Sequence, residues 1–170
     1  RKKLEQRLEK RMLELTKPLE DAGDIDFTEL IDIDTMQKLQ DQFSDATGVA
    51  SVITHTDGSP ITRTSNFTRL CETIIRETEK GCENCYKSDA VIGAYSAEGP
   101  IIKSCLSGGL WDAGAAITVG GKHVANWLIG QDRDENMKVD QLAAYARERM
   151  TAGADQQARH SVRAFLPRPV

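Results

Sequence analysis

The sequence predicts an α+β fold, in which an antiparallel sheet of about five strands has inserted and flanking helices. Two observations define the strands: β-like runs flank a turn at Asp57-Gly58, and two further β-like runs flank Gly120-Gly121. A third observation places helices between these hairpins, because apolar residues recur at helical spacing from residue 67 to residue 75. The 170 residues are enough for one compact domain and an appendage.

Residues 1–21 are expected to form an amphipathic helix. Apolar residues recur there every three or four positions, with charged residues between them: Leu4, Leu8, Met12, Leu15 and Leu19. Two interpretations stay open, a helix that folds onto its own domain and a coiled-coil helix that carries a signal through a homodimer. Because the pattern is already under way at Arg1, we expect the chain to be a fragment of a longer protein. Residues 22–33 form a linker, and the main domain covers residues 34–166.

The first half of the main domain begins with a helix and a hairpin. The helix is expected at residues 34–47, between the N-cap Asp34 and the terminator Gly48. Strands follow at residues 49–55 and 61–64. The side chains expected along one side of the helix are Met36, Leu39, Gln40 and Phe43.

Two helices are expected after this hairpin. The first runs from its cap Ser65 to Lys80, ends at Gly81, and has a buried stripe of Phe67, Leu70, Cys71, Ile74 and Ile75. The second covers residues 83–95 and buries Val91, Ile92 and Tyr95.

The second half of the domain supplies the remaining strands. They are expected at residues 101–106, 115–119 and 123–130, with a break at residues 107–112. Closing helices are expected at residues 138–150 and 156–166. Two strands, a helical excursion and three further strands make the order of a PAS-like sensor domain, an analogy at the level of fold.

Composition excludes several classes of protein. The formal net charge of −4 gives no bulk attraction for phosphate backbones, so direct nucleic-acid binding is not expected. No apolar run approaches the ~20 residues that span a bilayer, and no signal segment is present, so a cytoplasmic domain without membrane insertion is expected. The three histidines and the missing nucleophile and metalloprotease motifs do not support catalysis. We therefore do not expect an enzyme.

An ordered set of short motifs resembles the PocR sensory domain over residues 34–132. Its pieces are residues 37–44, Thr47-Gly48-Val49, Asp57-Gly58, Asn66-Phe67, Cys71, Cys85-Tyr-Lys-Ser-Asp89, Cys105-Leu-Ser-Gly-Gly-Leu110 and Ile129-Gly130-Gln131. The resemblance implies a PAS-like ligand-binding domain of histidine kinases (two-component systems) and transcription regulators. It further implies that the domain senses a small hydrocarbon derivative, such as a short alcohol or diol, and passes the signal to an output domain. The chain departs from one family variant at Leu106, where that variant has histidine.

The segment from Cys105 to Asp112 is the strongest candidate for contact with a small organic ligand. Gly108-Gly109 would let the backbone approach a ligand, Trp111 would supply an apolar wall, and Asp112 would accept hydrogen bonds. The alternative is a sheet bulge at the glycines with Trp111 in the core. The full predicted set is Cys71, Cys85, Cys105, Ser107, Gly108, Gly109, Trp111 and Asp112.

The four cysteines allow a second interpretation. In a reducing compartment they are thiols or ligands rather than disulfides. Cys82 and Cys85 have CxxC spacing, and Cys71 and Cys105 would complete a set for zinc or an iron–sulfur cluster, or for redox sensing. Only one tight pair is present, and Cys71 lies on an apolar stripe, so we predict no metal and no cofactor. Cys71, Cys85 and Cys105 match the cysteine pattern that the resemblance implies, and Cys82 is additional.

Overall fold

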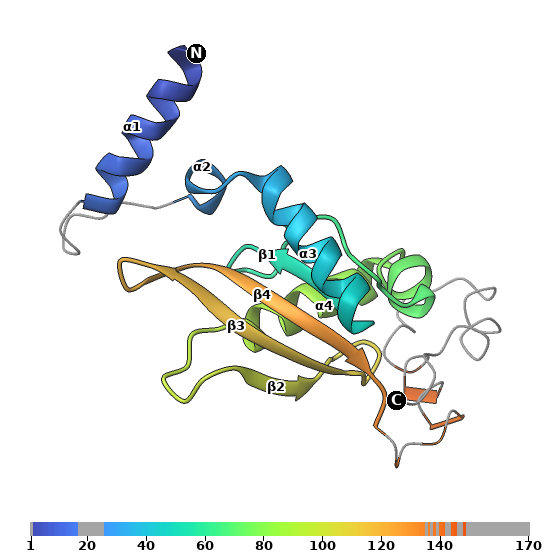
Figure 1. Ribbon diagram of the computed structural model, residues 1–170. Helices are drawn as coiled ribbons and strands as arrows, with labels where there is room; N and C mark the ends of the chain where they lie inside the picture. The colour runs from blue at the N-terminus through green and yellow to red at the C-terminus, as the bar shows by residue number, and fades with distance from the viewer. Residues whose placement is uncertain are drawn as a thin grey trace.

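Four strands form one antiparallel sheet in the computed structural model, which describes residues 2–16, 26–134, 136, 138, 140, 141, 144, 145 and 148. The order in the sheet is β1-β4-β3-β2 (Figure 1). The strands are β1 (Ala50–Thr54), β2 (Ile101–Ser104), β3 (Trp111–Val119) and β4 (Lys122–Asp132). The helices are α1 (Lys2–Thr16), α2 (Phe27–Leu30), α3 (Ile33–Thr47), the π-helix η1 (Cys71–Ile75) and α4 (Glu79–Ile92).

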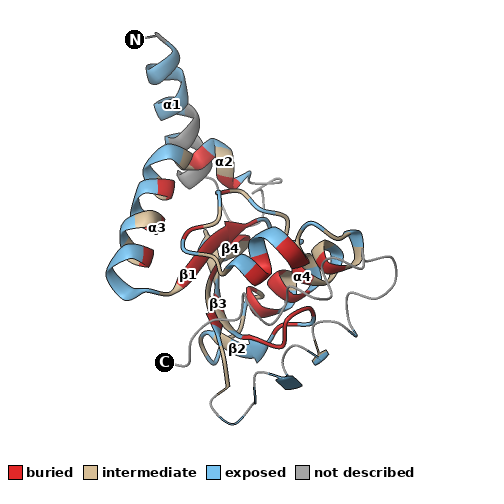
Figure 2. Cartoon of the chain, turned by 90° about the vertical axis from the view of Figure 1, so that its right-hand side faces the viewer, coloured by how far each residue is buried: buried red, intermediate tan, exposed pale blue. Residues whose placement is uncertain are grey.

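The sheet lies between two helical layers, as Figure 2 shows from the side. On one face α3 packs against β1 and reaches β4 through one aromatic pair, in which the Phe43 ring meets the Trp127 ring edge-on with 6.2 Å between centroids. On the other face α4 packs through Ile92 onto Val52 and Leu128. Neighbouring residues of a strand point to opposite faces, which explains why Trp127 contacts α3 and Leu128 contacts α4.

The predicted second hairpin is confirmed. β3 and β4 pair antiparallel, and the turn between them is made by Gly120 and Gly121, with φ of 57° and 80°. A two-residue turn with positive φ at both positions matches the right-handed twist of the strands, and glycine adopts it without strain. The break predicted at residues 107–112 is shorter, because β3 already begins at Trp111.

The prediction of a fifth strand at residues 61–64 is wrong for the described residues. That segment meets β1 through the isolated bridges Thr54–Pro60 and Ser51–Ser65, and between them Ile61 N and Thr62 N both donate to Ile53 O, so no regular ladder forms. The reason is that side chains occupy its backbone groups. Arg63 N donates to Gln37 Oε1 at 2.8 Å, and Arg63 O accepts from Gln40 Nε2 at 2.8 Å.

Helix α3 packs against the rest of the domain through a largely polar side. Its predicted terminator is confirmed, since Gly48 has a φ of 78°, but the N-cap is Asp32 rather than Asp34. Leu39, predicted to lie along the packed side, is exposed. The buried residues of α3 are Gln37, Gln40 and Ser44.

The long helix predicted for residues 65–80 is replaced by two separate elements. Ser65 does not cap a helix but pairs with Ser51, and η1 supplies one π-turn over Cys71–Ile75. A new helix, α4, starts at Glu79, where the Thr78 hydroxyl accepts from Gly81 N at 3.1 Å. Gly81 therefore lies in the first turn of α4 instead of ending a helix. Within α4, Ile92 is buried as predicted, whereas Val91 and, beyond the helix, Tyr95 are exposed.

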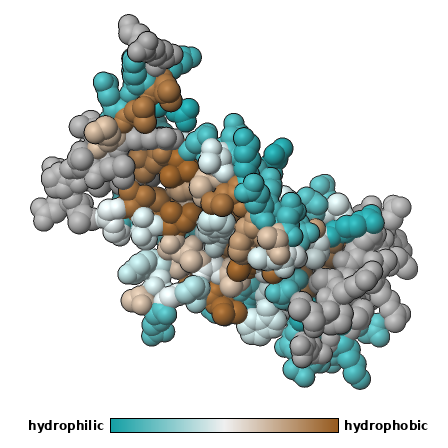
Figure 3. Space-filling view, viewed as in Figure 1, coloured by the Kyte–Doolittle hydropathy of each residue, from teal (hydrophilic) through white to brown (hydrophobic). Residues whose placement is uncertain are grey.

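Other predicted segments lie partly or wholly outside the described residues. The closing helix predicted at residues 156–166 lies wholly outside them, and of the helix predicted at residues 138–150 only six residues are described. Inside the predicted linker, α2 inserts Phe27 into a core cluster with Ile53 and Ala125. α1 exposes Leu4, Leu8 and Met12, which form apolar surface among charged residues in Figure 3. Among the described helices, none is long and apolar enough to cross a membrane.

Candidate functional site

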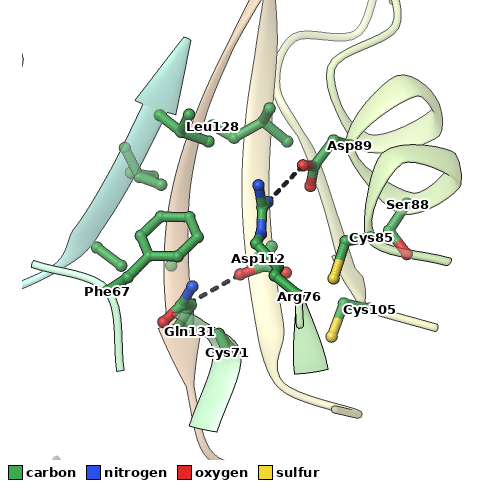
Figure 4. Close-up of a pocket in the computed structure, with 14 residues that line it drawn as sticks. Phe67, Cys71, Arg76, Cys85, Ser88, Asp89, Cys105, Asp112, Leu128 and Gln131 are labelled. Atoms are coloured by element: carbon green, nitrogen blue, oxygen red, sulfur yellow. Dashed lines mark hydrogen bonds and ion pairs between the residues drawn. The ribbon is translucent and has the colours of Figure 1, made fainter. Parts of the chain in front are cut away.

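A small cavity of about 30 Å³ lies between the α4 face of the sheet and the two elements η1 and α4 (Figure 4). The strands β1, β3 and β4 form its floor, and residues 67–89 and 105 form its remaining walls. Its lining consists of Ala50, Val52, Phe67, Cys71, Arg76, Cys85, Ser88, Asp89, Cys105, Asp112, Leu128, Ile129, Gly130 and Gln131. The cavity therefore has an apolar side and a side rich in polar groups.

Arg76 is the only cation among the described residues that line this cavity. Its guanidinium pairs with Asp89 at 2.9 Å, and both side chains are largely buried. The guanidinium also lies 5.0 Å from the centre of the Phe67 ring and 6.0 Å from that of Tyr86. Its Nε is buried and has no hydrogen-bond partner among the described residues. A buried donor without a partner is costly, so this atom points to a missing acceptor.

Asp112 connects the cavity to the end of β4. Its Oδ1 accepts from Gln131 N at 2.8 Å, and the side chain of Gln131 accepts from Thr68 N at 2.7 Å. Gly130 lies so close to Asp112 that a Cβ at this position would come within 2.6 Å of the Asp112 Oδ1. Burial raises the pKa of Asp112 to about 7, against the lowering effect of the Gln131 hydrogen bond. Burial likewise raises the pKa of Asp89 to about 6, which outweighs its pairing with Arg76.

The buried environment of the three cavity cysteines favours the neutral thiol form. The Cys105 sulfur accepts from Gly108 N at 3.3 Å, and the Cys85 thiol lies 3.5 Å from the Ser107 hydroxyl. Burial raises the pKa of Cys85 to about 12, and it raises the pKa of Cys71 and Cys105 above the ordinary value of a thiol. Thiolates are the nucleophilic and metal-binding form of cysteine, and this environment disfavours them.

Four of the predicted site residues line the cavity: Cys71, Cys85, Cys105 and Asp112. The other four do not. Ser107 is buried behind Cys85 and donates to Gly81 O at 3.0 Å. Gly108 and Gly109 form the turn that holds Cys105. Trp111 supplies no wall, because it is 41% exposed and pairs with Ser104 and Asp132 at one end of the sheet.

The cysteines do not assemble as one set of four. Cys82 is partly exposed and lies outside the lining of the cavity, although it is three residues from Cys85. No group of three or more His, Cys, Asp or Glu side chains among the described residues is arranged to hold a metal ion.

Several lining residues were not nominated from the sequence. Phe67, Asp89 and Gln131 stand inside motifs of the family resemblance, and that signal would have found them. Arg76 had no such signal, because a cation after an apolar helical stripe is ordinarily a solvated residue.

The comparisons with known proteins fit this architecture. The family model of the sensory domain found in PocR matches residues 29–164. The chain belongs to the PocR sensory-domain family. Over 103 residues, 59% of this chain, it is 31% identical to the regulatory protein PocR of Salmonella typhimurium, and the match covers 33% of that protein. The chain thus spans about a third of this curated relative. No solved structure matches it.

Proposed function

We propose that this PocR sensory domain binds a small, uncharged, hydroxylated hydrocarbon, such as a short alcohol or diol, in the cavity of Figure 4. Binding, without catalysis, is its role within a larger signal-transduction protein. The observation that carries the proposal is the convergence of an apolar wall with buried polar groups, one of which, Arg76 Nε, has no hydrogen-bond partner among the described residues. A sensory family and a regulatory relative support the general role.

The size of the cavity favours a ligand of few atoms. Pockets for drug-sized ligands measure about 300–1,000 Å³. A cavity of about 30 Å³ has room for only about two waters. A ligand with several carbons therefore has to displace part of the wall, and this displacement is what a sensor needs.

The charge balance favours a neutral ligand. Arg76 and Asp89 neutralise each other, and Asp112 adds a further carboxyl group without a cation of its own in the lining. An anionic ligand would find no unpaired cation among these groups in a poorly solvated space, which is unfavourable. A hydroxyl group, in contrast, both donates to a carboxylate and accepts from a guanidinium.

The alternative function is metal or redox sensing by Cys71, Cys82, Cys85 and Cys105. It has less support, because burial raises the pKa of the three cavity thiols and Cys82 lies apart from them. The organic ligand is therefore the better-supported proposal.

The test is a thermal-shift screen of the reduced, purified chain against short alcohols, diols, aldehydes and carboxylic acids. One class should raise the melting temperature in a saturable way, since a ligand at 100 times its Kd adds about 2.7 kcal/mol of stability. Asp112→Asn should weaken this response, and the matched control Cys82→Ser, outside the cavity, should keep it. If no compound of the panel changes the melting temperature and the protein contains stoichiometric zinc or iron, metal or redox sensing by the cysteines becomes the favoured function.

The signal would leave the domain through α1. We expect its apolar seam, which includes Leu4 and Leu8, to pair with the same seam of a second copy. Leu8→Glu places a charge in that seam, so light scattering should show the dimer giving way to a monomer. The matched control is Glu9→Gln, which should leave the dimer intact; a chain that is monomeric before substitution contradicts this expectation.

A further inference from the structure

The π-helix η1 is a single wide turn whose two ends both reach the cavity. Arg76 N donates to Cys71 O, five residues earlier, at 3.0 Å. Cys71 and Arg76 both line the cavity. A π-turn holds about one residue more than an α-turn, is rare, and is found frequently at functional sites.

Arg76 lies between two spaces. On one side is the ligand cavity, with its partner Asp89. On the other side is a groove of about 700 Å³ between α3 and residues 60–64, which Arg76 lines together with Asp41 and Glu72. Carboxylates therefore lie on both sides of Arg76; in the groove Glu72 accepts from the Thr64 hydroxyl at 3.0 Å, and Asp41 accepts from Gln37 and Ser65.

The geometry of the turn decides which carboxylate Arg76 reaches. In an α-turn, residues four apart are neighbours on one side of the helix, so Glu72 and Arg76 would form a favourable pair. In the π-turn the backbone instead joins Arg76 to Cys71. One residue of an α-helix corresponds to about 100° of rotation. Conversion of the π-turn to an α-turn, which holds one residue fewer, would therefore turn Arg76 by roughly that angle.

We propose that η1 is a two-state switch in which Arg76 exchanges Asp89 in the cavity for Glu72 in the groove beside α3. The π state is the one described above, and the α state directs the guanidinium toward α3. This inference rests on the proposed function for its ligand, but the two states exist without one. Asp41 of α3 lines the groove, so the arrival of a cation there changes the charge next to α3.

The unpartnered Nε of Arg76 explains how a ligand would shift the equilibrium between the π state and the α state. In the π state, Arg76 Nε is buried without an acceptor among the described residues, which disfavours that state unless a ligand supplies one. A ligand oxygen in the cavity accepts from Nε only when Arg76 faces the cavity. The ligand therefore binds the π state better than the α state, and this difference in affinity is what a population shift requires.

The test needs no ligand. In ¹⁵N NMR spectra of the free chain, Arg76→Lys identifies the Arg76 Nε–H signal, and its exchange with water reports how often Nε is solvated. Glu72→Gln weakens the α state and should slow this exchange by about twofold, the usual strength of an i,i+4 ion pair. Glu72→Lys should slow it further. Glu77→Gln, an exposed glutamate outside the groove, is the matched control and should leave the rate unchanged.

Asp89→Asn tests the other state and should speed the exchange, because Arg76 loses its partner in the cavity. Equal exchange rates in Glu72→Gln, Glu72→Lys, Glu77→Gln and the unsubstituted chain would overturn the switch, whether or not Asp89→Asn folds. With a diol series of two to four carbons, Glu72→Gln should bind up to about twofold tighter than the unsubstituted chain. A chain that binds none of the panel compounds contradicts the proposed function, while the exchange rates still decide on the switch.

Discussion

The two faces of the sheet hold their helices by different forces. On the α4 face, Ile92, Val52 and Leu128 form an apolar cluster beside the cavity. On the α3 face, Met36 and Phe43 also meet apolar residues, but the most deeply buried side chain of the helix is held by hydrogen bonds: Gln40 Nε2 donates to Arg63 O, to the Ser65 hydroxyl and to Ser51 O, and the Thr62 hydroxyl donates to Gln40 Oε1.

This difference implies that α4 is held mainly by apolar burial, whereas the docking of α3 depends on directional hydrogen bonds. Apolar burial is strong and tolerates small displacements, because it depends on area rather than direction. Hydrogen bonds contribute less net free energy but require a defined geometry. The α4 face thus supplies stability around the cavity, and the α3 face supplies a helix whose docking responds to small changes in position.

The largest expected effect is on the apolar face. Ile92→Ala removes a fully buried side chain and should lower the free energy of unfolding by about 2–5 kcal/mol in urea titrations. Val91→Ala, on the exposed side of the same helix, should change it by less than about 0.5 kcal/mol. Equal losses for the two variants would contradict the assignment of the α4 core.

The next effect is on the polar face. Gln40→Met keeps the length of the side chain but removes the partners of Arg63 O and the Ser65 hydroxyl, which should cost about 1–3 kcal/mol. Leu39→Ala, exposed on the same helix, serves as its control and should be nearly neutral. If Gln40→Met is as stable as the unsubstituted chain, α3 is not held by this network.

The smallest effect is a pH dependence that belongs to the cavity side. The pKa of Asp112 is raised from 3.8 to about 7, so between these values the folded state holds a proton that the unfolded chain releases. Stability from this group is complete below pH 4 and is lost as pH rises toward 7. Asp112→Asn should therefore flatten the fall in unfolding free energy between pH 5 and 6.5 by about 1 kcal/mol per pH unit, as urea titrations at several pH values would show.

Asp57 provides the comparison for this measurement. The Ser59 hydroxyl and backbone N–H lower the pKa of Asp57, so its contribution is present above pH 4 and is lost only as pH falls further. Asp57→Asn should leave the slope between pH 5 and 6.5 unchanged. An unaltered slope in Asp112→Asn would show that this carboxyl does not take up a proton in the folded state over that range.

Local sequence signals predicted the parts of the fold that depend on neighbouring residues. Gly48 ends α3 and Gly120-Gly121 turn the second hairpin because the required backbone angles are available to glycine at little cost. The prediction of a fifth strand failed because the backbone groups of Arg63 bond to Gln37 and Gln40, more than 20 residues away. No local sequence pattern indicates such contacts. The split into η1 and α4 was missed because the apolar stripe at residues 70–75 is equally compatible with an α-helix and a π-helix.

The candidate site was predicted where chemistry and burial agree. Cys71 was placed on an apolar stripe and Asp112 was the one carboxyl in its motif, and both line the cavity. Trp111 was misplaced because its size suggested burial, whereas its position at the end of β3 leaves it exposed. Arg76 was missed because only the fold brings Asp89 and the two aromatic rings to it. These contacts offset the desolvation cost of burying a guanidinium.

The polar underside of α3 has a consequence for solubility. The part of α3 that meets β1 and residues 62–65 buries mainly amides and hydroxyls, including Gln37, Gln40, Thr62 and Ser65. Hydration of such groups adds little to the heat capacity, so the equilibrium should depend only weakly on temperature. Opening confined to this part leaves the apolar contacts of Met36 and Phe43 in place, so it exposes little contiguous apolar area for non-specific association. Local loosening of this kind would therefore not make the domain prone to aggregation.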